Sequence, residues 1–167
     1  MKCGAFFVFS IISIGIWLVF SGCETEQEKV RDYNNKIVLV LTDAGLRMQK
    51  LDEALFQNSR ISEQYHLARL KADSCSSALN EIGLYNKDTT LINPAKKLID
   101  TYQDLLKNEY QTLVQFHTSP QNEVTFEWVD STRVLRMNVQ NKSTFVQLDF
   151  ENAQQSFADR YLLHLIE

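Results

Sequence analysis

Glycine and proline are scarce in this chain, which has five glycines and two prolines in 167 residues. It contains no Asn-Gly or Asp-Gly pair, the strongest short-range signal for a tight β-hairpin. The glycine-rich phosphate loop and the G-x-S-x-G turn of α/β-hydrolases are also missing. These absences exclude the nucleotide-binding and hydrolase classes that depend on such motifs, and they leave little turn chemistry for hairpins.

Histidine and cysteine, three of each, are dispersed, and no H-E-x-x-H or C-x-x-C motif occurs. One E-x-x-H, from Glu63 to His66, lies in a predicted helix. Di-iron bundles need two such motifs and two more glutamates, so we interpret it as solvated helix surface. His117 is expected at a helix C-terminus, where the helix dipole favours a charged imidazole. We predict no catalytic, metal-binding or cofactor-binding residue and no cofactor. The rival hypothesis is a small hydrolase or metal enzyme that uses a dispersed histidine such as His164.

Charge is absent over a long N-terminal stretch. After Lys2, residues 3–23 carry no charged side chain, and their core, AFFVFSIISIGIWLVF, is almost wholly apolar. A positive start followed by such an apolar run is typical of a signal peptide, which we assign to residues 1–22. An uncleaved signal anchor is the alternative, because about 20 apolar residues are enough to span a bilayer.

The apolar run ends in Phe20, Ser21, Gly22 and Cys23. This FSGC stretch resembles the lipobox of bacterial lipoproteins, with Phe20 where leucine is usual. In that family the cysteine thiol receives a diacylglyceryl group, and cleavage makes the cysteine the mature N-terminus. The resemblance implies that Cys23 is lipidated and anchors the protein in the bacterial cell envelope, in the outer membrane, facing the periplasm or the outside. Two or three acyl chains are a sufficient anchor, since each buried CH₂ contributes about 0.8 kcal/mol.

The remaining chain suits one modest domain. Removing 22 residues from 167 leaves 145, and the loss of Lys2 changes the formal net charge from −4 to −5. This negative charge argues against nucleic acid as a partner. With Cys3 removed and Cys23 acylated, Cys75 has no intramolecular partner for a disulfide. We place a lipidated tether at 23–29 and a helical bundle domain at 30–167.

Two helices with heptad-type seams are predicted at residues 27–57 and 60–82. Ser59 is the candidate N-cap of the second helix, and Gly83 is expected to end it. Gly45 weakens the first helix but would let a neighbouring helix approach closely. Apolar residues recur at steps of four and three: Ile37, Leu41, Ala44, Met48, Leu51 and Leu55 in the first seam, and Ile61, Tyr65, Ala68, Ala72, Cys75, Leu79 and Ile82 in the second.

A third helix is predicted at 94–116, with Pro94 in its first turn. Its apolar stripe consists of Leu98, Tyr102, Leu105, Leu106, Leu113 and Phe116. The loop that precedes this helix keeps four apolar residues for covering the core: Leu84, Tyr85, Leu91 and Ile92.

The last 45 residues carry two competing patterns. The segments VTFEWV, VLRMNV and TFVQLDF are rich in β-branched and aromatic residues, and DSTR and QNKS could be hairpin turns. Neither turn contains glycine, however, and the apolar residues also fit one helical face, so we favour a helix over 122–142 and over 143–164. That face holds Trp128, Leu135, Val139, Val146, Phe150, Ala153, Phe157, Tyr161 and Leu165.

Together these patterns predict an all-α fold, an antiparallel up-down four-helix bundle on a lipidated tether. The stretches YNNKIV and AQQSFADRY also resemble small uncharacterised helical lipoproteins of Bacteroidota and spirochaetes, a group without an activity to transfer. We expect a non-catalytic structural or binding role at the membrane. The alternative is an adaptor subunit with an envelope protein partner. Some apolar residues are additional to the predicted seams. They could face that partner, or they could widen the core-facing stripes, and we favour the second interpretation. These residues are Val38, Leu39, Val40, Val134, Met137, Phe145 and Leu148.

Overall fold

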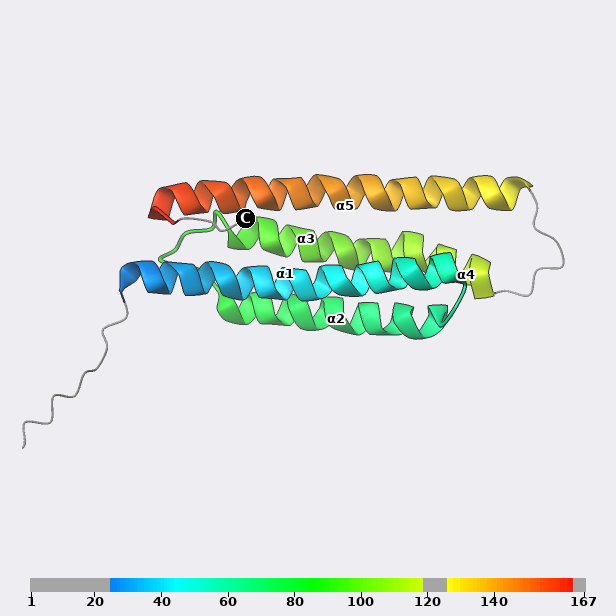
Figure 1. The fold of residues 1–167 in the computed structure, drawn as a ribbon, viewed down its shortest axis with the longest axis horizontal. Coiled ribbons are helices and arrows are strands. Elements are labelled where there is room, and N and C mark those ends of the chain that lie inside the picture. The colour runs from blue at the N-terminus through cyan, green and yellow to red at the C-terminus, as the bar shows by residue number, and fades with distance from the viewer. Residues whose placement is uncertain (1–24, 119–125, 164–167) are drawn as a thin grey trace, which may run out of the picture.

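The computed structural model describes residues 25–118 and 126–163, and these residues form helices and no strand. The all-α prediction is confirmed. Three consecutive helical segments, α3, η1 and α4, follow one another without a break and form one rod. The elements in Figure 1 are α1 (Glu26–Gln57), α2 (Ile61–Ile82), α3 (Ile92–Leu105), the π-helical turn η1 (Leu106–Tyr110), α4 (Gln111–Thr118) and α5 (Phe126–Tyr161).

Side-chain contacts fix the relative direction of α1 and α2. Near the start of α1, the hydroxyl of Tyr33 donates to the backbone oxygen of Gly83 at the end of α2, over 3.0 Å. Further along α1, Asp43 pairs with Lys71 at 3.1 Å. The residue number therefore falls along α2 as it rises along α1, so the two helices are antiparallel.

The same reasoning orients α5, which lies along one edge of the bundle in Figure 1. Lys97 of α3 pairs with Asp149 at 2.8 Å, and Glu109 of η1 pairs with Lys142 at 2.7 Å. The α5 helix is thus antiparallel to the rod. It packs mainly on α3 and only lightly on α1, which leaves the side between α1 and α5 loosely closed.

The predicted seams of the first two helices form the core. All six seam residues of α1 are buried, and so are Ile61, Ala68, Ala72, Cys75 and Leu79 of α2. Tyr65 and Ile82 are partly buried and pack against the same core. The seam prediction is therefore confirmed, because a 4–3 apolar spacing keeps one stripe of each helix against its neighbour.

The loop between α2 and α3 covers the core less completely than predicted. Leu91 and Ile92 are buried and Tyr85 packs against the core, whereas Leu84 is exposed. Gly83, which ends α2 as predicted, adopts a left-handed φ of +66° and turns the chain there. Tyr85 faces inward because its ring packs on those of Tyr33 and Phe157, whereas Leu84 points outward.

The first helix starts earlier than the assigned tether allows. Thr25 and Glu28 form a capping box, in which the Thr25 hydroxyl accepts from the backbone N–H of Glu28 and the Glu28 carboxylate accepts from that of Thr25. This box satisfies two N–H groups that a helix start otherwise leaves unpaired. Residues 26–29, assigned to the tether, therefore form the first turn of α1.

The turn between α1 and α2 differs from the prediction that Ser59 caps α2. Arg60 takes the N-cap position with a left-handed φ of 55°, and no side chain bonds the first turn there. Asn58 is also left-handed, and the N–H of Ser59 donates to the backbone oxygen of Ala54. Asparagine tolerates this conformation well and ends helices with it, so the chain turns before Ser59 can act as a cap.

The rod formed by α3, η1 and α4 contains a π-helical turn that the sequence periodicity did not predict. Buried side chains recur along it at every fourth residue, at Tyr102, Leu106, Tyr110 and Val114. In an α-helix of 3.6 residues per turn, steps of four drift around the helix surface. The wider turn of η1 takes up this drift and keeps the stripe facing the core.

The ambiguous C-terminal segment is one helix from Phe126 to Tyr161, and the hairpin alternative is wrong there. The helix ends three residues before the predicted end at 164, and Leu162 turns the chain with a left-handed φ of 54°. Residues 122–125, Leu165 and the side chain of Trp128 lie outside the described part. The remaining members of the predicted face do turn inward. Val139, Val146, Phe150 and Phe157 are buried, and Leu135, Ala153 and Tyr161 are partly buried.

The extra apolar residues behave differently on α1 and α5. Val38 and Val40 pack partly against the core, as favoured, but Leu39 is exposed. On α5 the favoured interpretation is wrong, because four residues expose 47–65 % of their area on the side away from the core. The α5 helix lies at the edge of the bundle (Figure 1), so this side of it is largely open to solvent, and Phe145 reaches only the rim of α3, where its ring lies 5.4 Å from Nζ of Lys97. These four residues are Val134, Met137, Phe145 and Leu148.

An aromatic cluster closes the end of the bundle at which α1 begins. Tyr33, Tyr85, Phe157 and Tyr161, from α1, the α2–α3 loop and α5, have ring centroids 4.7–6.5 Å apart. The rings meet at tilted or edge-on angles, which are favourable for aromatic pairs. The cluster therefore joins three segments that are distant in the sequence.

Asp88 ties the α2–α3 loop to the end of α5. Its carboxylate accepts from the backbone N–H of Thr90 (2.7 Å), from Arg160 (2.7 Å) and from the hydroxyl of Tyr161 (3.1 Å). Burial acts to raise the pKa of Asp88, but the hydrogen bonds from these three residues outweigh it and hold the pKa at about 2. The folded state thus favours the charged carboxylate.

We expect the protein to lose stability as the pH falls from about 4 to about 2. An unfolded aspartate has a pKa of about 3.9, so the depressed folded pKa of Asp88 contributes on the order of 2 kcal/mol at neutral pH. This contribution is fully present above the unfolded pKa and disappears as the pH falls through the folded one. Urea midpoints measured between pH 6 and 2 should show the loss in the wild type and a shallower loss in Asp88→Asn.

Candidate functional site

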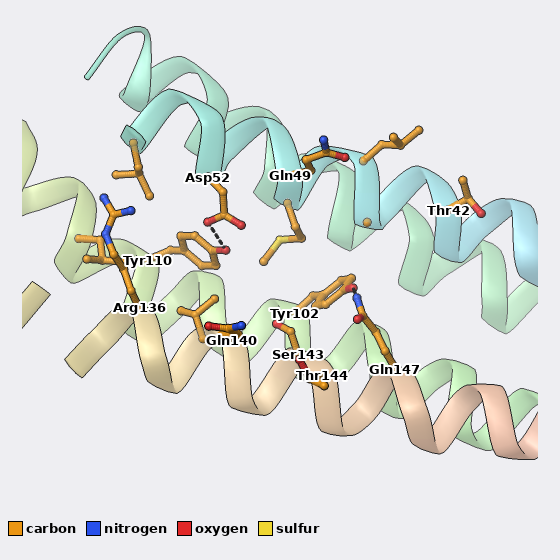
Figure 2. A pocket seen from close by; sticks show the side chains of 16 residues that line it. Thr42, Gln49, Asp52, Tyr102, Tyr110, Arg136, Gln140, Ser143, Thr144 and Gln147 are labelled. Atoms are coloured by element: carbon orange, nitrogen blue, oxygen red, sulfur yellow. Dashed lines mark hydrogen bonds between the residues drawn. The ribbon is translucent and has the colours of Figure 1, made fainter. Parts of the chain in front are cut away.

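A groove runs between α1 and α5, with Tyr102 and Tyr110 of the α3–η1 rod as its floor (Figure 2). We call it the α1/α5 groove. Its volume of about 630 Å³ lies within the range of about 300–1,000 Å³ that is typical of small-molecule sites. Its lining consists of Thr42, Gly45, Leu46, Met48, Gln49, Asp52, Leu55, Tyr102, Tyr110, Leu113, Arg136, Val139, Gln140, Ser143, Thr144 and Gln147.

Asp52 and Tyr110 form a hydrogen-bonded pair in the groove. The hydroxyl of Tyr110, a fully buried residue, donates to Oδ1 of Asp52 over 2.7 Å, as the dashed line in Figure 2 shows. Burial and the charge of Asp52 raise the pKa of Tyr110, so its hydroxyl remains a donor. Burial also raises the pKa of Asp52, although the bond from Tyr110 and the charge of Arg136 counteract it. Asp52 is an exposed residue that lines the groove, so its carboxylate can accept a further hydrogen bond there.

The groove is amphipathic. Met48, Leu55 and Val139 supply apolar surface beside the aromatic floor. On the α5 side, Gln147 donates to the hydroxyl of Tyr102 over 2.9 Å and so holds the floor in place. Such a surface suits a molecule with an apolar body and hydrogen-bonding groups along one edge. Further polar side chains that line it and are labelled in Figure 2 are Thr42, Gln49, Gln140, Ser143 and Thr144.

Gly45 lies in the middle of α1 and lines the groove. A Cβ atom placed on it would meet no atom within 4 Å. The prediction that Gly45 lets a neighbouring helix approach is therefore wrong, because the groove lies over it. A glycine inside a helix costs about 1 kcal/mol relative to alanine. Neither close packing nor a left-handed backbone conformation explains the glycine at this position, since the space over Gly45 is part of the groove.

The predicted E-x-x-H lies on the outer surface of α2. Glu63 accepts from two nitrogens of Arg60 at 2.7 and 2.6 Å, and His66 is exposed. No group of three or more His, Cys, Asp or Glu residues in the described part of the chain is arranged to hold a metal ion. The structure thus places both residues on a solvated helix face.

His117 lies in the last turn of α4, where its Nδ1 is 3.2 Å from Oδ1 of Asn58. We predicted a charged imidazole there, but burial and the nearby charge of Arg136 lower the pKa of His117. The neutral form is therefore favoured, because desolvation and a like charge outweigh the helix dipole. His117 does not line the α1/α5 groove, and His164 lies outside the described residues.

Cys75 is buried between α1 and α2, and its thiol lies 3.4 Å from the backbone oxygen of Val40. Burial raises the pKa of this thiol and keeps it protonated. A protonated, inaccessible thiol is a poor nucleophile. Cys23, the predicted lipidation site, lies outside the described residues.

No family model, curated protein or solved structure matches the chain. Within residues 25–118 and 126–163, no helix combines the length and apolar character needed to cross a membrane.

Proposed function

We propose that this chain is a lipid-anchored protein of the bacterial cell envelope whose bundle binds an amphipathic small molecule in the α1/α5 groove, without catalysing a reaction. The observation that carries the proposal is Gly45. It weakens a 32-residue helix at a place where no protein atom needs the space. A ligand that occupies this space would explain why the helix carries a glycine there.

The chemistry of the groove supports binding rather than reaction. None of the described residues that line it is a histidine or a cysteine. Ser143 and Thr144 therefore have no imidazole beside them in the groove to act as a general base. The Tyr110 hydroxyl is committed to Asp52, whose remaining oxygen accepts a hydrogen bond from a hydroxyl or ammonium group of the ligand. We propose this recognition role in place of the rival enzyme hypothesis.

The start of α1 supports the anchoring part of the proposal. Thr25 caps the helix and stands two residues after Cys23. Two residues span at most about 7 Å, so a lipid on Cys23 would hold the aromatic end of the bundle at the membrane surface. The groove lies on the side of the bundle, between α1 and α5, and would therefore be open to soluble molecules on the side of the membrane that carries the protein.

We expect Gly45→Trp to abolish binding while the protein stays folded, because the indole ring would fill the free space of the groove. The full chain purified in detergent is denatured, and the released small molecules are compared by mass spectrometry between wild type and variant. We expect at least one molecule that is abundant in the wild type and reduced at least tenfold in Gly45→Trp. Gly45→Ala should keep it and raise the free energy of unfolding by up to about 1 kcal/mol.

Leu70→Trp is the matched control, because Leu70 is exposed on α2 outside the groove. It carries the same bulky side chain and should leave the bound molecule unchanged. Identical small-molecule profiles for wild type and Gly45→Trp would exclude the groove as a ligand site.

Cys23 is expected to carry the anchor. Cells grown with a fatty-acid analogue should label the wild-type chain, and Cys23→Ser should lose the label and the usual cleavage. Retention of label by Cys23→Ser would refute lipidation at this residue. The outcome is independent of the groove, because the two sites share no residue.

A further inference from the structure

The exposed apolar residues of α5 form a pattern that is symmetric about Asn141. Val134 and Leu148 stand seven residues before and after it, and Met137 and Phe145 stand four residues before and after it. At about 100° per residue, these five side chains share one face of the helix, opposite the buried face. We call this face the outer stripe. Its four apolar members are about half exposed or more, although the ring of Phe145 also lies 5.4 Å from Nζ of Lys97 on α3. The α5 helix itself lies at the edge of the bundle (Figure 1).

We propose that the outer stripe binds the outer stripe of a second copy of this chain, with the two α5 helices antiparallel and a two-fold axis through Asn141. Val134 of one copy then lies opposite Leu148 of the other, and Met137 opposite Phe145. Each Asn141 faces its counterpart, and because an amide both donates and accepts, the two side chains satisfy one another. A single asparagine in an apolar helix seam fixes register in this way.

Charges beside the stripe favour the antiparallel arrangement. Arg133 stands eight residues before Asn141 and Glu151 ten residues after it, and the helical period places both on the same edge of the stripe. Antiparallel pairing brings Arg133 of each copy to within about 3 Å in height of Glu151 of the other, since each residue rises 1.5 Å. A parallel pairing would leave both without an opposite charge across the interface. Within one copy Arg133 pairs with Asp130 at the surface, a contact weak enough to be exchanged.

The size of the stripe sets the strength of the association. The fourteen steps of 1.5 Å from Val134 to Leu148 span about 21 Å. Two such stripes bury on the order of 1,000 Å² in total, the lower limit for a specific interface. The dimer is therefore reversible and concentration-dependent. Its antiparallel order places the two starts of α1 at opposite ends, so two anchors in one membrane would hold the dimer lengthwise along the surface.

Sedimentation of the full chain in detergent tests the dimer. We expect the wild type to shift from monomer to dimer as its concentration rises, and Phe145→Lys to weaken the association at least tenfold. Phe56→Lys is the control, because Phe56 is an exposed phenylalanine of α1 and the substitution is the same. Equal weakening by both variants, or a wild type that stays monomeric at every concentration, would overturn the proposal.

Cysteine cross-linking tests the direction of the helices. Under mild oxidation, a mixture of Val134→Cys and Leu148→Cys chains should form a disulfide between the two variants. Each variant alone should give no more cross-linked dimer than the wild type. The wild type measures the background of cross-links that the native cysteines form. Self-cross-linking of Val134→Cys would show a parallel pair and overturn the proposed geometry. Absence of cross-links in the mixture would overturn it as well.

Discussion

Ala72→Glu should lower the melting temperature by about 6–20 °C, because it places a charged side chain in the core. Ala72 lies in the middle of the α2 seam and is only 3 % exposed. A glutamate there would be buried without a partner, which costs about 3–5 kcal/mol. For a domain of this size, each kcal/mol corresponds to about 2–4 °C in melting temperature. Thermal melts followed by circular dichroism provide the measurement.

Leu70→Glu is the matched control for this prediction. Leu70 belongs to the same helix, is about half exposed and receives the same new charge. Its variant should melt within about 2 °C of the wild type, since surface changes rarely exceed 0.5 kcal/mol. The adjacent Lys71 would be a poor control, because it pairs with Asp43 of α1. If Ala72→Glu and Leu70→Glu melt alike, the buried face of α2 is assigned to the wrong side.

The helices could be predicted because their apolar spacing repeats over many residues. Ile37 to Leu55 and Ile61 to Ile82 keep the 4–3 rhythm throughout, and every one of these seam residues is buried or packed against the core. The start of α1 was also readable, since Thr25 and Glu28 have the spacing of a capping box. The predicted helix start at residue 27 is one residue from the observed start at Glu26, so it is the boundary of the tether at residue 29 that is wrong.

The groove could not be predicted because it depends on the distance between helices. Asp52 follows a buried seam residue, Leu51, and reads in the sequence as ordinary helix surface. What makes it part of a site is that α5 packs on α3 and leaves the side next to α1 loosely closed. Periodicity reports which side of a helix is apolar, but it does not report how far the next helix stands from it.

The outer stripe of α5 shows the same limit. A second apolar face predicts contact with something, and the favoured expectation was a broader core. The bundle leaves α5 at its edge, with buried residues such as Val146 on one side and exposed ones such as Leu148 and Met137 on the other. The sequence pattern identified the core-facing residues of α5 correctly, but it did not show how wide the buried face is, because that depends on the position of the helix in the bundle.

Asn141→Pro should destabilise the protein by at least about 3 kcal/mol. Asn141 lies fifteen residues after the first residue of the α-helix Phe126–Tyr161 and twenty before its last, well inside its regular hydrogen bonding. Proline removes the N–H that donates to the residue four positions earlier, and its ring clashes with that carbonyl. The resulting kink would pull Val139 and Val146, buried on either side of it, out of a common line. The midpoint of urea unfolding should fall clearly.

Asn141→Ala separates the backbone effect from the loss of the side chain. Alanine is a better helix former than asparagine, so this variant should be as stable as the wild type or up to about 0.7 kcal/mol more stable. Both variants are compared at a concentration at which the chain is monomeric, so that contacts between copies do not contribute. A proline variant as stable as the alanine variant would mean that the backbone at Asn141 is a turn, as the sequence QNKS alone permits. A large difference between them would show that residues on both sides of Asn141 belong to one helix, which the groove and the outer stripe both require.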